Sequence, residues 1–159
     1  MRSILIVCTA NICRSPMAEV LLRKKISERQ IEGEWQVGSA GTWGEDGLPA
    51  SSNGITVMRE RGLDTSSHLS LSINEKLLEE ADLVLAMTAG HVESLKIDFP
   101  EYSSRIFRLA EMAGAPYDIE DPYGGSLEDY RRTADELAML LERGLERIIQ
   151  LAATPLHGA

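Results

Sequence analysis

The residues best suited to chemistry lie near the start of the chain, where five residues separate Cys8 from Arg14. A cysteine thiolate is a strong nucleophile, and the planar guanidinium of an arginine can hold two oxygens of one phosphate group. A tight loop between these two residues can present successive backbone N–H groups, which form a concave site for an anion. The spacing therefore favours a loop that binds phosphate and a cysteine that attacks phosphorus.

The neighbours of this motif decide between that chemistry and a chance match. If the match is due to chance, Cys8 is simply a small buried residue at the end of a strand, and Arg14 is a solvated residue at the start of a helix. Residues 3–7 are rich in Ile, Leu and Val, as in a buried parallel strand, and Pro16 suits the first turn of a helix. The N-terminus of that helix adds free N–H groups and its dipole, so Cys8 is expected to be a thiolate near neutral pH. Asn11 tolerates the left-handed backbone that a tight loop needs.

Hydrophobic periodicity predicts alternating strands and helices along the chain. The expected strands are residues 3–7, 34–39, 83–87 and 105–109. The expected helices are residues 16–29, 51–61, a short one that opens with a capping box at 72–75 and ends near 80, one from 88 to about 100, and 126–152. This order indicates one α/β domain over residues 1–159, with three α/β/α layers and a central four-stranded parallel sheet, as in Rossmann- and flavodoxin-like folds. Ligands bind such sheets beyond the carboxyl ends of the strands, where Cys8 is expected.

Composition and charge limit the classes of function. The chain has 159 residues, of which 43% are hydrophobic and 26% charged, as in a globular domain, and its net charge of −9 argues against a general affinity for nucleic acid. No apolar stretch approaches the roughly 20 residues of a membrane span, and the apolar run before Cys8 is too short for an export leader. With two cysteines, three histidines and no CxxC pair, neither a disulfide framework nor a zinc site is expected. We expect a cytoplasmic monomer without metal or cofactor and without membrane insertion.

Residues 8–19, with the sequence CTANICRSPMAE, resemble the phosphate-binding loop of the low-molecular-weight protein tyrosine phosphatases. The resemblance runs nearly end to end and includes SAGT at 39–42, ADLVLAM at 81–87 and DPYGG at 121–125. It implies hydrolysis of phosphotyrosine in phosphorylated proteins through a cysteinyl-phosphate intermediate, without a metal. One departure is Ala10, where the family usually has Gly, so Ala10 is expected to avoid a strongly positive φ.

The resemblance also implies catalytic roles. Cys8 would be the nucleophile, Arg14 the phosphate clamp and Asp121, the aspartate of the family's Asp-Pro motif, the general acid and base. Asp-Pro-Tyr-Gly-Gly taken alone is also good turn chemistry, and Asp118 and Glu120 are nearby carboxylates. The remaining residues of the phosphate-binding loop are Thr9, Ala10, Asn11, Ile12, Cys13 and Ser15.

Supporting roles follow from the same resemblance. Ser15 is expected to donate a hydrogen bond to the sulfur of Cys8 and help it leave. Asn11, Ser39 and His68 match a buried polar network that holds the loop in shape, although a histidine after two serines is also common on a surface.

The substrate is expected to enter between Trp43 and Tyr123, whereas Trp35 is assigned to the core. A bacterial subgroup of the same fold, the protein arginine phosphatases, has Thr at the position of Ile12. A branched apolar side chain there favours a phenyl ring over a guanidinium, so phosphotyrosine is predicted, with phosphoarginine as the alternative. A non-catalytic phosphate-binding module is a further alternative, but such a module would be expected to lose Cys8 or Asp121.

Two further interpretations concern the chemistry of the cysteines. Arsenate reductases share the fold but need additional cysteines downstream. No cysteine follows Cys13, so an arsenate reductase is not expected. The family is known for a reversible disulfide between the cysteines that match Cys8 and Cys13. Reversible inactivation by peroxide is therefore expected.

Overall fold

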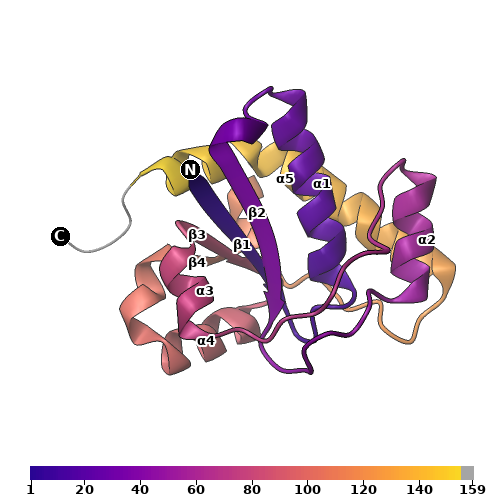
Figure 1. The fold of residues 1–159 in the computed structure, drawn as a ribbon, viewed down its shortest axis with the longest axis horizontal. Coiled ribbons are helices and arrows are strands. Elements are labelled where there is room, and N and C mark those ends of the chain that lie inside the picture. The colour runs from indigo at the N-terminus through magenta and orange to yellow at the C-terminus, as the bar shows by residue number, and fades with distance from the viewer. Residues whose placement is uncertain (155–159) are drawn as a thin grey trace.

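In the computed structural model, residues 1–154 are described and build a four-stranded parallel sheet with the strand order β2-β1-β3-β4 (Figure 1). The strands are β1 Arg2–Cys8, β2 Trp35–Gly41, β3 Leu83–Ala86 and β4 Ile106–Arg108. The strand β1 is central, because it pairs with β2 along its full length and with β3 from Ile4 to Val7. The predicted parallel sheet is confirmed.

Helices cover both faces of the sheet, which confirms the three-layer prediction (Figure 1). One face carries α1 Arg14–Glu28 and α5 Leu127–Ala153, with α2 Ser52–Glu60 packed against α5, and the other face carries α3 Glu75–Glu80 and α4 Ala89–Asp98. Short 3-10 helices lie at Glu32–Glu34, Pro100–Arg105 and Leu109–Ala113.

The alternation of side chains along β1 produces two separate cores. Ile4 and Ile6 point to the α1/α5 face, and Leu5 and Val7 point to the α3/α4 face, and all four are at least 95% buried, with exposures of 5% or less. A run that is apolar at every position, rather than at every second one, is what a strand covered on both faces requires. Because helices cover both faces of the sheet, the carboxyl end of β1, at Cys8, is where the strand leads into the loop.

Two local predictions need correction. The short helix α3 is capped by Asn74, whose side chain accepts a hydrogen bond from the Leu77 N–H at 2.9 Å, and not by Ser72. Ser72 is engaged elsewhere, because its N–H donates to Asp46 at 2.6 Å and its backbone bridges to Gly41. Trp35, predicted to be a core residue, is only half-buried and packs against the edge of the core. In residues 1–154, no helix has the length and apolar character that crossing a membrane requires.

Candidate active site

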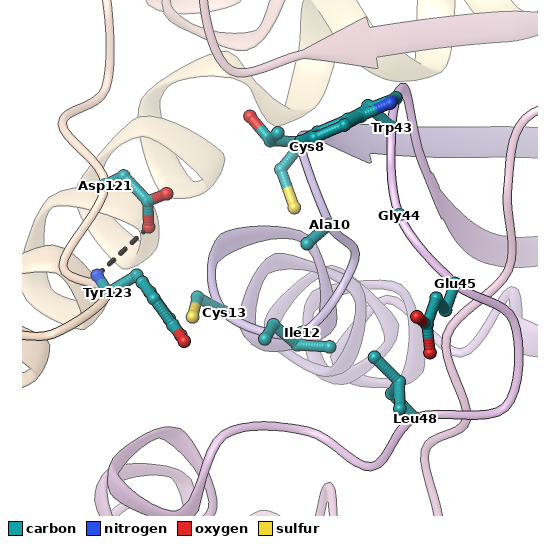
Figure 2. Close-up of a pocket in the computed structure, with 11 residues that line it drawn as sticks. Cys8, Ala10, Ile12, Cys13, Trp43, Gly44, Glu45, Leu48, Asp121 and Tyr123 are labelled. Carbon is teal, nitrogen blue, oxygen red and sulfur yellow. Dashed lines mark hydrogen bonds between the residues drawn. The ribbon is translucent and has the colours of Figure 1, made fainter.

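The loop between β1 and α1 forms the floor of a pocket of about 550 Å³. Cys8 ends β1 and is 2% exposed, and α1 begins at Arg14. Figure 2 shows this loop and the side chains around it, which come from three segments of the chain. The lining residues are Cys8, Thr9, Ala10, Ile12, Cys13, Trp43, Gly44, Glu45, Leu48, Asp121 and Tyr123. The N-terminal motif, the loop after β2 and the Asp-Pro motif therefore meet at one place.

The loop backbone turns at Asn11, whose φ is 60°. Asparagine adopts this left-handed conformation more readily than most residues, as the sequence predicted. Ala10 has no positive φ, also as predicted. The loop packs tightly on β2, because a Cβ atom added to Gly41 would lie 2.5 Å from the carbonyl oxygen of Thr9. Gly41 is thus the residue type that this close approach requires.

A buried polar network holds the loop in shape around Asn11, which has no exposed surface. Its side-chain amide nitrogen donates to the hydroxyls of Ser15 at 2.7 Å and Ser39 at 2.9 Å, and its side-chain oxygen accepts from the Leu71 N–H at 2.9 Å. The carbonyl oxygen of Asn11 lies 2.7 Å from His68 Nε2, which must be the donor because a carbonyl can only accept. The structure therefore brings together all the residues expected in this network.

Each of the two cysteine sulfurs has a hydroxyl partner. The Ser15 oxygen lies 2.9 Å from Cys8 Sγ, and the Tyr130 hydroxyl lies 3.3 Å from Cys13 Sγ. Both cysteines are free and buried. Burial raises the pKa of the Cys13 thiol, and burial together with the Cys13 contact raises the pKa of Tyr130 to about 12. Cys13 and Tyr130 are therefore both protonated at neutral pH.

Arg14 is 4% exposed, and the protein holds its guanidinium through both terminal nitrogens. Nη1 donates to the Ile119 carbonyl at 2.8 Å, and Nη2 donates to the Thr9 hydroxyl at 3.3 Å and lies 3.5 Å from an Asp121 oxygen. The buried Nε has no hydrogen-bond partner among the described residues. An unpaired buried N–H is costly, and an oxygen of a bound phosphate group would satisfy it.

Asp121 presents an accessible carboxylate to the pocket. Its side chain is 43% exposed, and one oxygen accepts from the Tyr123 N–H at 3.1 Å, which fixes the turn (Figure 2). Asp118, the weaker candidate, is bound instead to the Ala89 N–H at 2.8 Å and to Arg108 at 3.2 Å. These bonds lower the pKa of Asp118, so it is ionised and is poorly suited to donate a proton.

The mouth of the pocket carries exposed aromatic side chains, as expected. Trp43 is 82% exposed and Tyr123 is 69% exposed, and Figure 2 shows Ile12 on the wall between the loop floor and Leu48. Sequence reasoning did not assign Glu45 or Leu48 to this wall, because the loop from β2 to α2 has no periodic pattern that indicates which way its side chains face.

Sequence reasoning also missed His91, which lies beside the loop. It lies in the first turn of α4, is 8% exposed, and its Nε2 is 2.8 Å from the Thr9 hydroxyl. Burial and the charge of Arg14 lower the pKa of His91 to about 4. Within the described part of the chain, no cluster of three or more His, Cys, Asp or Glu side chains could hold a metal ion.

Comparison with known proteins gives a consistent picture. The sequence matches the family described as low molecular weight phosphotyrosine protein phosphatase over residues 3–152. A protein-arginine-phosphatase of Geobacillus stearothermophilus is 40% identical over 146 residues, which cover 91% of this chain and 95% of the relative. A probable low molecular weight protein-tyrosine-phosphatase of Ralstonia solanacearum is 34% identical over 145 residues, or 91% of this chain and 92% of the relative. The crystal structure of a low molecular weight protein tyrosine phosphatase from T. tengcongensis has a TM-score of 0.87 at 42% identity, and the match covers 92% of this chain and 99% of that one. The chain therefore belongs to the low molecular weight phosphotyrosine protein phosphatase family and is a phosphatase.

Proposed function

We propose that the chain hydrolyses phosphotyrosine in proteins, with Cys8 as nucleophile, Arg14 as phosphate clamp and Asp121 as general acid and base. The observation that carries this proposal is that Cys8 and Asp121 line the same pocket. The buried Arg14 guanidinium lies 3.5 Å from that carboxylate. These are the groups that a two-step displacement at phosphorus needs.

In the first step the Cys8 thiolate attacks phosphorus in line with the leaving oxygen. The S–P bond forms as the bond from phosphorus to the phenolic oxygen breaks, and Asp121 gives its proton to that oxygen. The N–H groups of the loop and the guanidinium of Arg14 stabilise the equatorial oxygens.

In the second step water attacks the cysteinyl-phosphate. Asp121, now a carboxylate, takes a proton from the water, the S–P bond breaks, and the electron pair returns to the Cys8 sulfur. The Ser15 hydroxyl, 2.9 Å from that sulfur, stabilises the thiolate as it leaves. Inorganic phosphate and the starting enzyme result.

The preference for phosphotyrosine rests on Ile12, which lines the pocket beside the loop floor (Figure 2). A phenyl ring can pack on this branched apolar side chain. Ile12 offers no hydrogen-bond partner to the N–H groups of phosphoarginine, and an N–H group buried against it would cost about 1–3 kcal/mol, or about 5- to 150-fold in rate.

Phosphoarginine remains the second candidate substrate. Two relatives named protein-arginine-phosphatase, from Geobacillus stearothermophilus and Bacillus subtilis, are 40% and 41% identical to this chain. The carboxylates of Asp121 and Glu45 also face the pocket and are able to pair with a guanidinium.

Substitution of the nucleophile tests the mechanism. Cys8→Ser should abolish turnover of p-nitrophenyl phosphate and phosphotyrosine peptides, while inorganic phosphate still binds in isothermal titration calorimetry. Turnover close to wild type in Cys8→Ser would remove this cysteine from the mechanism.

The substrate preference is tested by kcat/KM on matched phosphotyrosine and phosphoarginine peptides. The wild type should prefer phosphotyrosine, and Ile12→Thr should raise the phosphoarginine-to-phosphotyrosine ratio. Leu48→Thr introduces the same hydroxyl on the part of the wall next to Ile12 but outside the phosphate-binding loop, and it serves as the matched control, with an unchanged ratio. A wild type that already prefers phosphoarginine contradicts the assignment.

A further inference from the structure

A chain of hydrogen bonds runs from His91 on α4 to the phosphate-binding loop. His91 Nε2 lies 2.8 Å from the Thr9 hydroxyl oxygen, and the same oxygen accepts a hydrogen bond from Arg14 Nη2 at 3.3 Å. All three side chains are in the interior or at its edge: His91 is 8% exposed, and Arg14 is 4% exposed. His91 and Arg14 are therefore linked by hydrogen bonds through the side chain of Thr9.

The hydroxyl of Thr9 can serve both neighbours at once. A guanidinium can only donate, so the Thr9 oxygen is the acceptor for Arg14, and its own proton remains free for His91 Nε2. This arrangement requires an imidazole whose Nε2 is unprotonated. The ring is neutral at physiological pH, because burial and the charge of Arg14 outweigh the opposing effect of the Asp121 and Asp118 carboxylates and lower the pKa of His91 to about 4.

The bond to Thr9 is one of only a few restraints on the guanidinium of Arg14. Ile119 holds Nη1 through its carbonyl at 2.8 Å, and Thr9 and Asp121 lie near Nη2. Asp121 is the weaker restraint, since its carboxylate is 43% exposed and 3.5 Å away. The Nε atom of Arg14 is buried and has no hydrogen-bond partner among the described residues. The orientation of the guanidinium plane therefore decides whether this N–H group meets a phosphate oxygen.

We propose that His91 is a positioning residue for the reaction: it fixes the Thr9 hydroxyl, which in turn fixes the guanidinium of Arg14 in the orientation that binds phosphate. This inference rests on the proposed role of Arg14 as the phosphate clamp. His91 itself does not touch the substrate.

A positioning role predicts a specific kinetic signature. Arg14 contacts the phosphate group in the bound substrate and in the transition state alike, so a misplaced guanidinium weakens both, which raises KM and leaves kcat nearly unchanged. The inhibition constant of inorganic phosphate should rise by the same factor. A purely structural role behaves differently: partial unfolding lowers the concentration of active enzyme, which lowers the apparent kcat but changes neither KM nor that inhibition constant.

The test uses three variants of His91 in the full chain. Phe keeps a ring but loses the hydrogen bond; the amide of Gln reaches the position of Nε2, whereas that of Asn reaches the position of Nδ1. With p-nitrophenyl phosphate as substrate and inorganic phosphate as inhibitor, His91→Phe and His91→Asn should raise KM and the inhibition constant about 3- to 10-fold, the usual worth of one hydrogen bond. His91→Gln should restore values closer to wild type. If His91→Phe does not fold, the Gln and Asn pair decides the question alone.

Thr9→Val completes the experiment, because it removes the hydroxyl through which His91 is proposed to act. Combining Thr9→Val with His91→Phe should then be no worse than Thr9→Val by itself, whereas independent effects would multiply. An unchanged inhibition constant in His91→Phe, equal values for Gln and Asn, or multiplying effects would each overturn the inference. A wild type that neither turns over nor binds phosphate would instead overturn the proposed function.

Discussion

The hydroxyl oxygen of Ser15 lies 2.9 Å from the sulfur of Cys8. The side-chain amide of Asn11 donates to the same oxygen at 2.7 Å, so Ser15 accepts from the amide and keeps its own proton for the sulfur. A hydrogen bond from Ser15 stabilises the thiolate relative to the neutral sulfur. It is therefore expected to help most when the thiolate reforms as a leaving group.

Removal of this donor should slow the second chemical step. In Ser15→Ala we expect kcat to fall about 10- to 150-fold, the worth of a hydrogen bond to a charged group, which is about 1.5–3 kcal/mol. The cysteinyl-phosphate should accumulate, visible as a burst of product or as a mass increase after acid quench. A fall in kcat without any accumulated phosphoenzyme would place the effect of Ser15 in the first step.

Substitution of Asp121 should lower activity much more than substitution of its neighbour Asp118. Asp121→Asn is expected to lower kcat for phosphotyrosine peptides by roughly 10²–10⁴, the usual worth of a general acid. The loss should be smaller for aryl phosphates whose leaving group needs no proton. Asp118→Asn is the matched control, because Asp118 is bound to Ala89 and Arg108 and not to the pocket; a larger loss in that variant would show that the wrong carboxylate was chosen.

Oxidation should produce a disulfide between Cys8 and Cys13. Peroxide converts the Cys8 thiolate to a sulfenic acid, and Cys13 then attacks this sulfur, with loss of water and formation of the S–S bond. Thiols should restore activity, and mass spectrometry should find the bond in the inactive form. In Cys13→Ser recovery should be poorer, because no resolving thiol remains; equal recovery would contradict the scheme.

The closure of that disulfide should depend on pH. Burial raises the pKa of Cys13, so only a small fraction is thiolate at neutral pH, and the attacking form increases as pH rises. After a short peroxide pulse, the ratio of disulfide to trapped sulfenic acid should increase from pH 6 to pH 8. A ratio that stays constant over this range would mean that deprotonation of Cys13 does not limit closure.

The contact of β2 with the loop predicts the effect of adding a methyl group. In Gly41→Ala the new Cβ would meet the Thr9 carbonyl oxygen at 2.5 Å and the backbone of Ala10 at 3.0 Å, so the loop must shift. We expect a loss of about 1–3 kcal/mol in the free energy of unfolding, measured in urea, together with weaker phosphate binding. Gly38→Ala in the same strand is the control, because its nearest neighbour is a Leu5 side-chain atom at 4.0 Å.

Much of the fold was predictable because each element carries its own periodic signal. The long helix α5, Leu127–Ala153, begins and ends within one residue of the predicted 126–152 range, and Ser126 caps it with Asp129. The cap of α3 was predicted wrongly because Ser72 and Asn74 are both good cap residues. Contacts of Ser72 with the loop after β2 decided between them, and such contacts have no local pattern.

The residues of the site also differ in whether a local sequence pattern predicts them. Cys8 and Arg14 were found because the chemistry and the loop lie in one continuous segment. The contact between Thr9 and His91 joins residues 82 positions apart, and the helix that carries His91 shows nothing unusual in its sequence. Only the packing of α4 against the sheet brings them together.

Because β1 is hydrogen-bonded on both sides, the sulfur of Cys8 is attached to the part of the molecule that should open last. The amide protons of Ile4 to Val7 are expected to exchange with deuterium only through global unfolding, whereas the exposed loops that carry Trp43 and Tyr123 can exchange through small local openings. Substrates of different shape can therefore be admitted by rearranging the rim, at little energetic cost. The attacking sulfur keeps its place at the end of the central strand.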